Sequence, residues 1–145
     1  MRRSLACVVV LLAAASSPLS AQTFSFGTGD ATLDVTLNSI NVQATANIGP
    51  YTADLSASFG VGQPQIQAWL TVDKMEPAEV YLALELGKLS GKPPATVVTL
   101  YKQNKGKGWG AVAKALGIKP GSAAFKALKS NATDKNQKLK AKKGK

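Results

Sequence analysis

The sequence predicts an α+β fold, in which an N-terminal antiparallel β-meander of three to four strands is followed by a compact bundle of three to five short helices. Residues 23–61 alternate between apolar and polar side chains, with the period of two that half-buried strands show. Beyond residue 62 the apolar residues recur at spacings of three and four, and proline or glycine bounds each run, as in helices. Four segments follow from this division: a signal peptide over 1–21, a β-rich segment over 22–62, a helical domain over 63–130 and a disordered lysine-rich tail over 131–145.

The β-rich segment is predicted from a change of phase. Leu33, Val35 and Leu37 alternate, and after a turn at 38–39 the alternation resumes on the same face from Ile40 to Ile48. A second turn at 49–50 leads into a third strand that ends at Phe59. A bulge near residue 38 within one long strand is the alternative. The apolar face needs a cover, which either the helices or a second copy of the chain would supply.

The helical half contains one strong helix, from Pro77 to Ser90, which ends at Gly91. It is apolar almost all round and therefore belongs in the middle of a core, with Glu79, Glu85 and Lys88 marking its solvent-facing strip. A short helix over residues 65–72 would present apolar side chains before it. The prolines at 93–94 open a further helix, which closes near residue 104.

Residues 106–122 form the most distinctive stretch of the chain. Trp109, Val112, Ala113 and Leu116 share one helical face, so Trp109 is expected to be a structural anchor. Gly117 stands where a left-handed cap ends a helix. After the proline at 120, Ser122 is a suitable N-cap for the next helix, in which Phe125 and Leu128 share a face.

Residues 93–130 resemble a helix-turn-helix unit, because three short helices are joined with a tight turn between the last two. The recognition helix would span residues 122–130. No Arg, Gln or Asn occurs in it, and those side chains make most bidentate contacts with base edges. The resemblance therefore implies a nucleic-acid-binding protein without the usual readers of sequence.

The string Gly106-Lys107-Gly108-Trp109-Gly110, followed by Ala113-Lys114-x-Leu116-Gly117-Ile118-Lys119-Pro120-Gly121-Ser122, is similar to a small helical domain of uncharacterised bacterial cell-envelope proteins. The similarity covers about residues 76–129. It implies a secreted or periplasmic location and no particular activity.

The N-terminus has the features of a secretory signal peptide. Basic residues at 2–3 precede an apolar run from Leu5 to Ala15, and cleavage is expected after Ala21. Eleven apolar residues are too few to span a bilayer. Cys7 precedes most of the run, which is the wrong place for a lipidation signal. We therefore expect an exported protein, periplasmic or extracellular, without a disulfide and without a transmembrane span in the mature chain.

Charge divides the chain sharply. Residues 22–73 carry four acids and no base, whereas residues 74–145 carry sixteen lysines and four acids. Lysine is a hydrated point charge that suits diffuse attraction to polyanions. Candidate binding residues for an anion or partner are Lys102, Lys105, Lys107, Lys119, Lys126 and Lys129. Anionic lipid or polysaccharide of the envelope, or a protein, is the expected partner.

The composition argues against an enzyme. The chain has no histidine and, after the signal peptide, no cysteine, which excludes Ser-His and Cys-His catalysis and the commonest zinc sites. Glu76, Glu79 and Glu85 favour a structural interpretation over paired acid/base chemistry, and the glycines near 106 lack the remaining P-loop pattern. We therefore expect a structural or interaction module with no cofactor or metal, and a nucleic-acid binder as the alternative.

Overall fold

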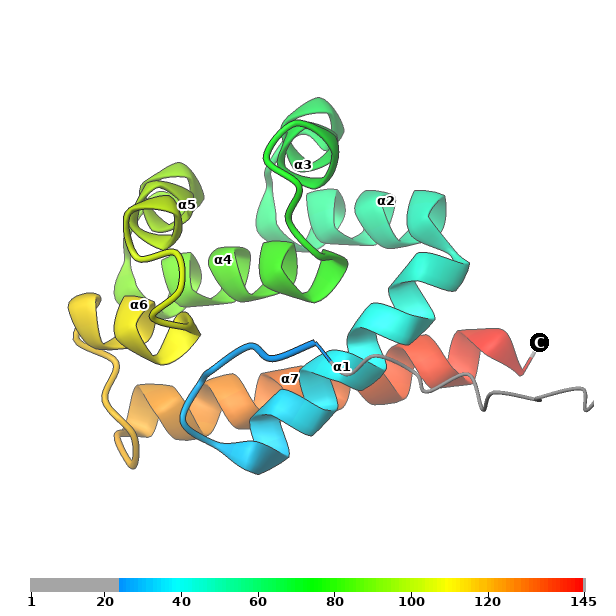
Figure 1. Ribbon diagram of the computed structural model, residues 1–145. Coiled ribbons are helices and arrows are strands. Elements are labelled where there is room, and N and C mark those ends of the chain that lie inside the picture. Colours follow the sequence, from blue (N-terminus) through cyan, green and yellow to red (C-terminus); the bar gives the residue numbers. More distant parts are fainter. Residues whose placement is uncertain (1–23, 145) are drawn as a thin grey trace, which may run out of the picture.

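The computed structural model describes residues 24–144, and the predicted signal peptide lies outside them. Seven helices and no strands make up the described part (Figure 1). They are α1 (Ala31–Ala46), α2 (Ile48–Phe59), α3 (Gln63–Thr71), α4 (Pro77–Ser90), α5 (Pro94–Gln103), α6 (Trp109–Ala115) and α7 (Ala123–Lys143).

The predicted β-meander, and with it the α+β fold class, is wrong. Residues 31–59 form α1 and α2, and the true core face of α1 is Leu33, Leu37, Ile40 and Ala44, at helical spacings of four, three and four. Val35 and Val42, which completed the apparent alternation, point outward and are 68% and 63% exposed. The alternation therefore arose from apolar residues that do not face the core.

The helix predicted from Pro77 to Ser90 is confirmed as α4, and it is the centre of the fold. α4 packs against α1, α2, α3, α5 and α7, and Figure 1 shows α3 and α5 above it with α1 and α7 below. The expected solvent-facing strip is wrong, because Glu79 and Glu85 are only 2% and 3% exposed while Lys88 alone is exposed. Surrounded on so many sides, α4 has no room for a polar strip.

α1 and α7 pack against each other, and both run from left to right in Figure 1, where α1 rises obliquely beside the nearly horizontal α7. Near their starts Lys129 pairs with Asp30 at 2.7 Å, and further along Ser39 donates a hydrogen bond to Asn136 at 2.9 Å. Asp30 also caps α1 by accepting from the backbone N–H of Leu33. Contacts between the first and last helices thus close the bundle.

The expected disordered tail is also wrong, because residues 131–143 continue α7. Ala132 and Lys135 are buried on the face that begins with Phe125 and Leu128, and Leu139 is partly buried there. The side-chain amide of Asn131 donates a hydrogen bond to Glu85 of α4. The second half of α7 is therefore part of the folded unit.

Truncation tests this correction. A chain ending at Ser130 should lose at least about 2 kcal/mol of unfolding free energy, because it lacks the buried Ala132 and the hydrogen bond to Glu85, each worth about 1 kcal/mol. Urea denaturation followed by circular dichroism measures the loss. A chain ending at Lys140 is the control and should unfold like the full chain. Equal stability of all three would restore the disordered tail.

Candidate functional site

The distinctive glycine-rich motif fixes the start of the described chain. The backbone N–H of Trp109 donates to the carbonyl oxygen of Phe26 at 2.8 Å, and that of Gly110 donates to Gly27 at 2.9 Å. A Cβ on Gly108 would lie 2.7 Å from the Gly27 oxygen, and one on Gly110 would lie 3.0 Å from it. The glycines are therefore required by the close approach of two backbones.

Trp109 links this contact to the core. Its indole Nε1 donates to Oε1 of Glu79 at 3.1 Å, and its ring stacks on Tyr101 with centroids 4.6 Å apart. The second oxygen of Glu79 accepts the backbone N–H of Glu76 at 2.9 Å, which completes a capping box at the start of α4. Glu79 is thus occupied by structural hydrogen bonds.

A cavity of about 400 Å³ lies beside the motif. Its walls include Phe24, Phe26, Tyr101, Trp109, Glu79 and Asn104. Burial, and then the adjacent Glu79 carboxylate, raises the pKa of Tyr101 well above its usual range, so this tyrosine stays protonated. The accessible aromatic surface comes mainly from Phe24 and Tyr101, because Phe26 and Trp109 are buried.

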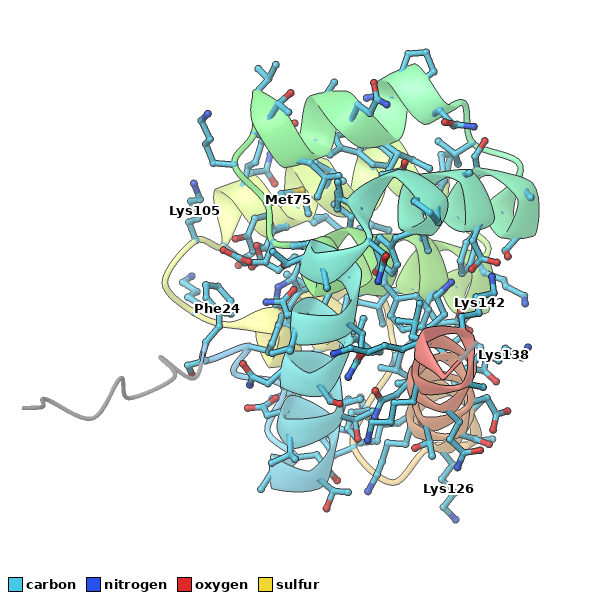
Figure 2. The ribbon with its side chains drawn as sticks, turned by 90° about the vertical axis from the view of Figure 1, so that its right-hand side faces the viewer. Phe24, Met75, Lys105, Lys126, Lys138 and Lys142 are labelled. Atoms are coloured by element: carbon cyan, nitrogen blue, oxygen red, sulfur yellow. The ribbon has the colours of Figure 1, made fainter. Side chains whose placement is uncertain are left out.

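The six predicted binding lysines do not form one patch. Lys102 pairs with Asp73 at 2.5 Å and Lys129 with Asp30, so these two are engaged in the fold. Lys105 and Lys107 lie in the α5–α6 connection, Lys119 in the α6–α7 connection and Lys126 on the outer face of α7, all exposed. Figure 2 shows Lys105 and Lys126 at widely separated edges of the molecule.

The ion pair at the start of α1 is electrostatically favourable. The hydrogen bond from Lys129, followed by that from the Leu33 backbone, lowers the pKa of Asp30. Asp30 therefore stays charged at neutral pH and holds Lys129 against α1. This lysine contributes to bundle closure more than to a free binding surface.

A second polar cluster escaped the sequence analysis. Lys135, only 8% exposed, pairs with Asp54 of α2, and its ammonium lies 5.3 Å from the ring centroid of Tyr51. Burial by itself would raise the pKa of Asp54, but the hydrogen bond and charge of Lys135, with Lys142 3.5 Å away, lower it. One sequence signal could have indicated that Lys135 is buried: it follows Leu128 and Ala132 at helical spacing and so continues their buried face.

Basic and acidic side chains differ sharply in their exposure to solvent. Thirteen of the fifteen lysines in residues 24–144 are exposed, whereas Asp134 is the one exposed acid among the eight there. Glu79 and Glu85 are buried, and the other acids are partly buried. The outer surface of the described part is therefore strongly positive.

Within the described residues, no cluster of three or more His, Cys, Asp or Glu side chains could hold a metal ion. None of the seven helices combines the length and apolar character that crossing a bilayer requires.

Comparison with known proteins gave no significant match to a family model, to a curated protein or to a solved structure. The similarity to envelope-protein domains noted from the motif therefore stays a prediction.

Two glycine variants test the structural role of the motif. Both Gly108 and Gly121 have a positive φ, near +80°, but a Cβ would meet the Gly27 backbone at Gly108 and open space at Gly121. Gly121→Ala should cost about 1 to 2 kcal/mol of unfolding free energy, because a side chain disfavours a positive φ. Gly108→Ala should cost about 4 kcal/mol or more, because its φ of 79° and ψ of 168° lie in a region that essentially only glycine adopts and an overpacking penalty of about 2 kcal/mol is added. Equal losses in urea denaturation would contradict the close backbone contact.

Proposed function

We propose that the protein is an exported, non-enzymatic interaction module that contacts anionic components of the cell envelope. The observation that carries the proposal is the separation of charge by exposure, with thirteen exposed lysines against one exposed acid. Such a surface attracts polyanions at long range and loses that attraction as salt screens it.

Ion pairs, hydrogen bonds and burial explain why the acidic side chains are so little exposed. Asp30, Asp54 and Asp73 form ion pairs with lysines, Asp34 accepts hydrogen bonds from Thr28, and the two central glutamates are buried in α4. These carboxylates are paired with lysines or buried, whereas most of the remaining lysines are exposed and unpaired with a described residue, so positive charge predominates on the surface of the described part.

The outward face of α7 is the surface we assign to the contact. Lys126 and Lys140 lie on that face and Lys143 lies at the C-terminal end of the helix; all three are exposed and form no ion pair with a described residue. The inward face of the same helix packs on α1 and α4. Each lysine near an anionic surface contributes about 1 kcal/mol of binding free energy.

Nucleic acid is the alternative polyanion. The α6–α7 connection ends in the Ser122 cap that a helix-turn-helix unit would have, but its seven residues, 116–122, exceed the usual turn of three to four residues. The exposed side chains of the first turns of α7 are Ala123, Lys126 and Ser130, which offer no bidentate reader of a base. Binding to DNA would therefore be limited to phosphate attraction and would be insensitive to sequence.

A pair of matched triple variants tests the proposal. Replacing Lys126, Lys140 and Lys143 by Gln should weaken binding to vesicles containing phosphatidylglycerol by about tenfold or more at 0.1 M salt. Replacing Lys74, Lys92 and Lys114 removes the same charge from other exposed positions and should have a much smaller effect. Sedimentation with vesicles at several salt concentrations gives both affinities, with acidic polysaccharide and duplex DNA as parallel ligands.

The outcomes separate the candidates. Absence of binding to every polyanion at physiological salt would refute the proposed function. Equal losses in the two triple variants would remove α7 as the contact surface. Tighter binding to duplex DNA than to vesicles, retained as salt rises, would favour the nucleic-acid alternative.

Export has its own test. Expression of the full chain with residues 1–21 should yield a periplasmic or secreted protein whose N-terminus is Gln22. Fractionation followed by mass spectrometry of the intact protein measures both properties. An uncleaved chain that stays in the cytoplasm would contradict the predicted location.

A further inference from the structure

A small polar cavity lies where α2, α4 and α7 meet, away from the glycine-rich motif. Its volume is about 220 Å³, below the roughly 300–1,000 Å³ of pockets that hold drug-sized ligands. It is nevertheless many times larger than the roughly 15 Å³ that one water needs. A cavity of this size can hold a small molecule or one residue of a polymer. The residues that matter are Phe59, Tyr81, Glu85, Asn131, Lys135 and Lys138.

Two nearly buried side chains in this cavity have polar atoms without a hydrogen-bond partner in the described part of the chain. Tyr81 is 2% exposed, and its hydroxyl forms no hydrogen bond with residues 24–144. Glu85 accepts from Asn131 through Oε1, while its Oε2 has no such bond. Since no fully enclosed side-chain polar atom of the described part is unpartnered, both atoms must be open to the cavity.

The two open atoms have complementary chemistry. Burial, and then the nearby carboxylates of Glu85 and Asp134, raises the pKa of Tyr81, so its hydroxyl stays protonated and can donate. Oε2 of Glu85 can only accept when the carboxyl is ionised. A ligand that fits both must therefore offer an acceptor and a donor a short distance apart.

The charged groups around the cavity balance. Lys88, Lys135 and Lys138 supply three ammonium groups, and three carboxylates face them from Asp54, Glu85 and Asp134. Lys135 is already paired with Asp54. An anion would meet the unpaired carboxylates, and an organic cation would meet the unpaired ammonium groups, so an uncharged ligand is favoured.

One wall of the cavity is aromatic. Phe59 packs edge-to-face against Tyr81, with ring centroids 6.2 Å apart, and Lys88 lies over its ring at 5.9 Å. Phe59 is only partly buried, so part of its ring can receive the C–H face of a saturated ring. The Tyr81 hydroxyl requires an acceptor on the ligand, and the Glu85 carboxylate requires a donor. A saturated ring with several hydroxyl groups supplies both, because each hydroxyl donates and accepts, and its C–H face can pack on the aromatic wall.

We propose that this cavity binds one uncharged sugar residue, held by the Tyr81 hydroxyl, the Glu85 carboxylate and the Phe59 ring. The inference rests on the proposed function, because it identifies polysaccharide as the envelope component that the protein recognises. The exposed lysines supply long-range attraction to the polymer, and the cavity selects one of its units.

Four probes with the same ring and different charge test the proposal on the full mature chain. Glucose and N-acetylglucosamine are uncharged, glucuronate is an anion and glucosamine is a cation. Titration followed by two-dimensional NMR should shift the side-chain amide of Asn131, and the uncharged pair should bind more tightly than the charged pair. Binding in the millimolar range is expected for a single residue in an open site.

Two nearly isosteric variants locate the binding. Tyr81→Phe removes a hydroxyl that has no hydrogen-bond partner among residues 24–144, and Glu85→Gln retains an oxygen that can accept from Asn131. Each should weaken binding of the uncharged sugars about fivefold to tenfold, as expected for the loss of one hydrogen bond. Tyr101→Phe changes the tyrosine of the other cavity and should leave the affinity unchanged. Phe59→Leu, which removes the aromatic wall at a partly exposed position and should also weaken sugar binding, replaces either variant that fails to fold.

The proposal is overturned if none of the four probes shifts Asn131, or if Tyr81→Phe and Glu85→Gln both bind sugar as the unchanged protein does. Tighter binding of glucuronate or glucosamine than of glucose would also overturn it. Vesicle binding measured on Tyr81→Phe separates this inference from the proposed function, because that variant alters no lysine. Lost sugar binding with retained vesicle binding confirms the cavity, whereas binding to vesicles, acidic polysaccharide and duplex DNA that is absent from all proteins refutes the charge-based function alone.

Discussion

The hydrogen bonds of the Glu79 carboxylate connect the start of α4 to the glycine-rich motif, and the rest of the fold depends on them. One oxygen caps the first turn of α4 and the other accepts the indole N–H of Trp109. Trp109 in turn positions the backbone N–H groups that hold Phe26 and Gly27. A buried carboxylate without hydrogen bonds would be costly, so Glu79, Trp109 and the N-terminal segment stabilise one another.

This arrangement explains why the most distinctive stretch of the sequence is not the best ligand site. The backbone N–H groups of Trp109 and Gly110 are bonded to Phe26 and Gly27, and Gly108 and Gly110 lie against the Gly27 backbone. Six residues along α4, Glu85 is buried to a similar extent, but only one of its oxygens is bonded to a described residue. The same central helix therefore carries one satisfied and one available carboxylate, and the available one lies at the opposite cavity.

Sequence patterns located the helices whose ends carry strong local signals. α4 has proline at its start and Gly91 at its end, and Ser122 caps α7 through its hydroxyl. The prediction failed over α1 and α2 because threonine, valine and isoleucine there favour strands, and Val35 and Val42 imitated an alternating face. Leu33, Leu37, Ile40 and Ala44 carried the helical period in the same segment, and tertiary packing against α4 and α7 selected it.

Composition misled the interpretation of the C-terminal segment in a different way. Phe125, Leu128, Ala132, Lys135 and Leu139 keep spacings of three and four, so α7 continues one inward face through a lysine-rich sequence. A lysine can occupy an inward position if its stem packs against apolar neighbours and its ammonium finds a carboxylate. For Lys135 that carboxylate is Asp54, which is 81 positions earlier in the chain. Because no local pattern reports such a partner, the polar cavity could be recognised only after the helices were placed together.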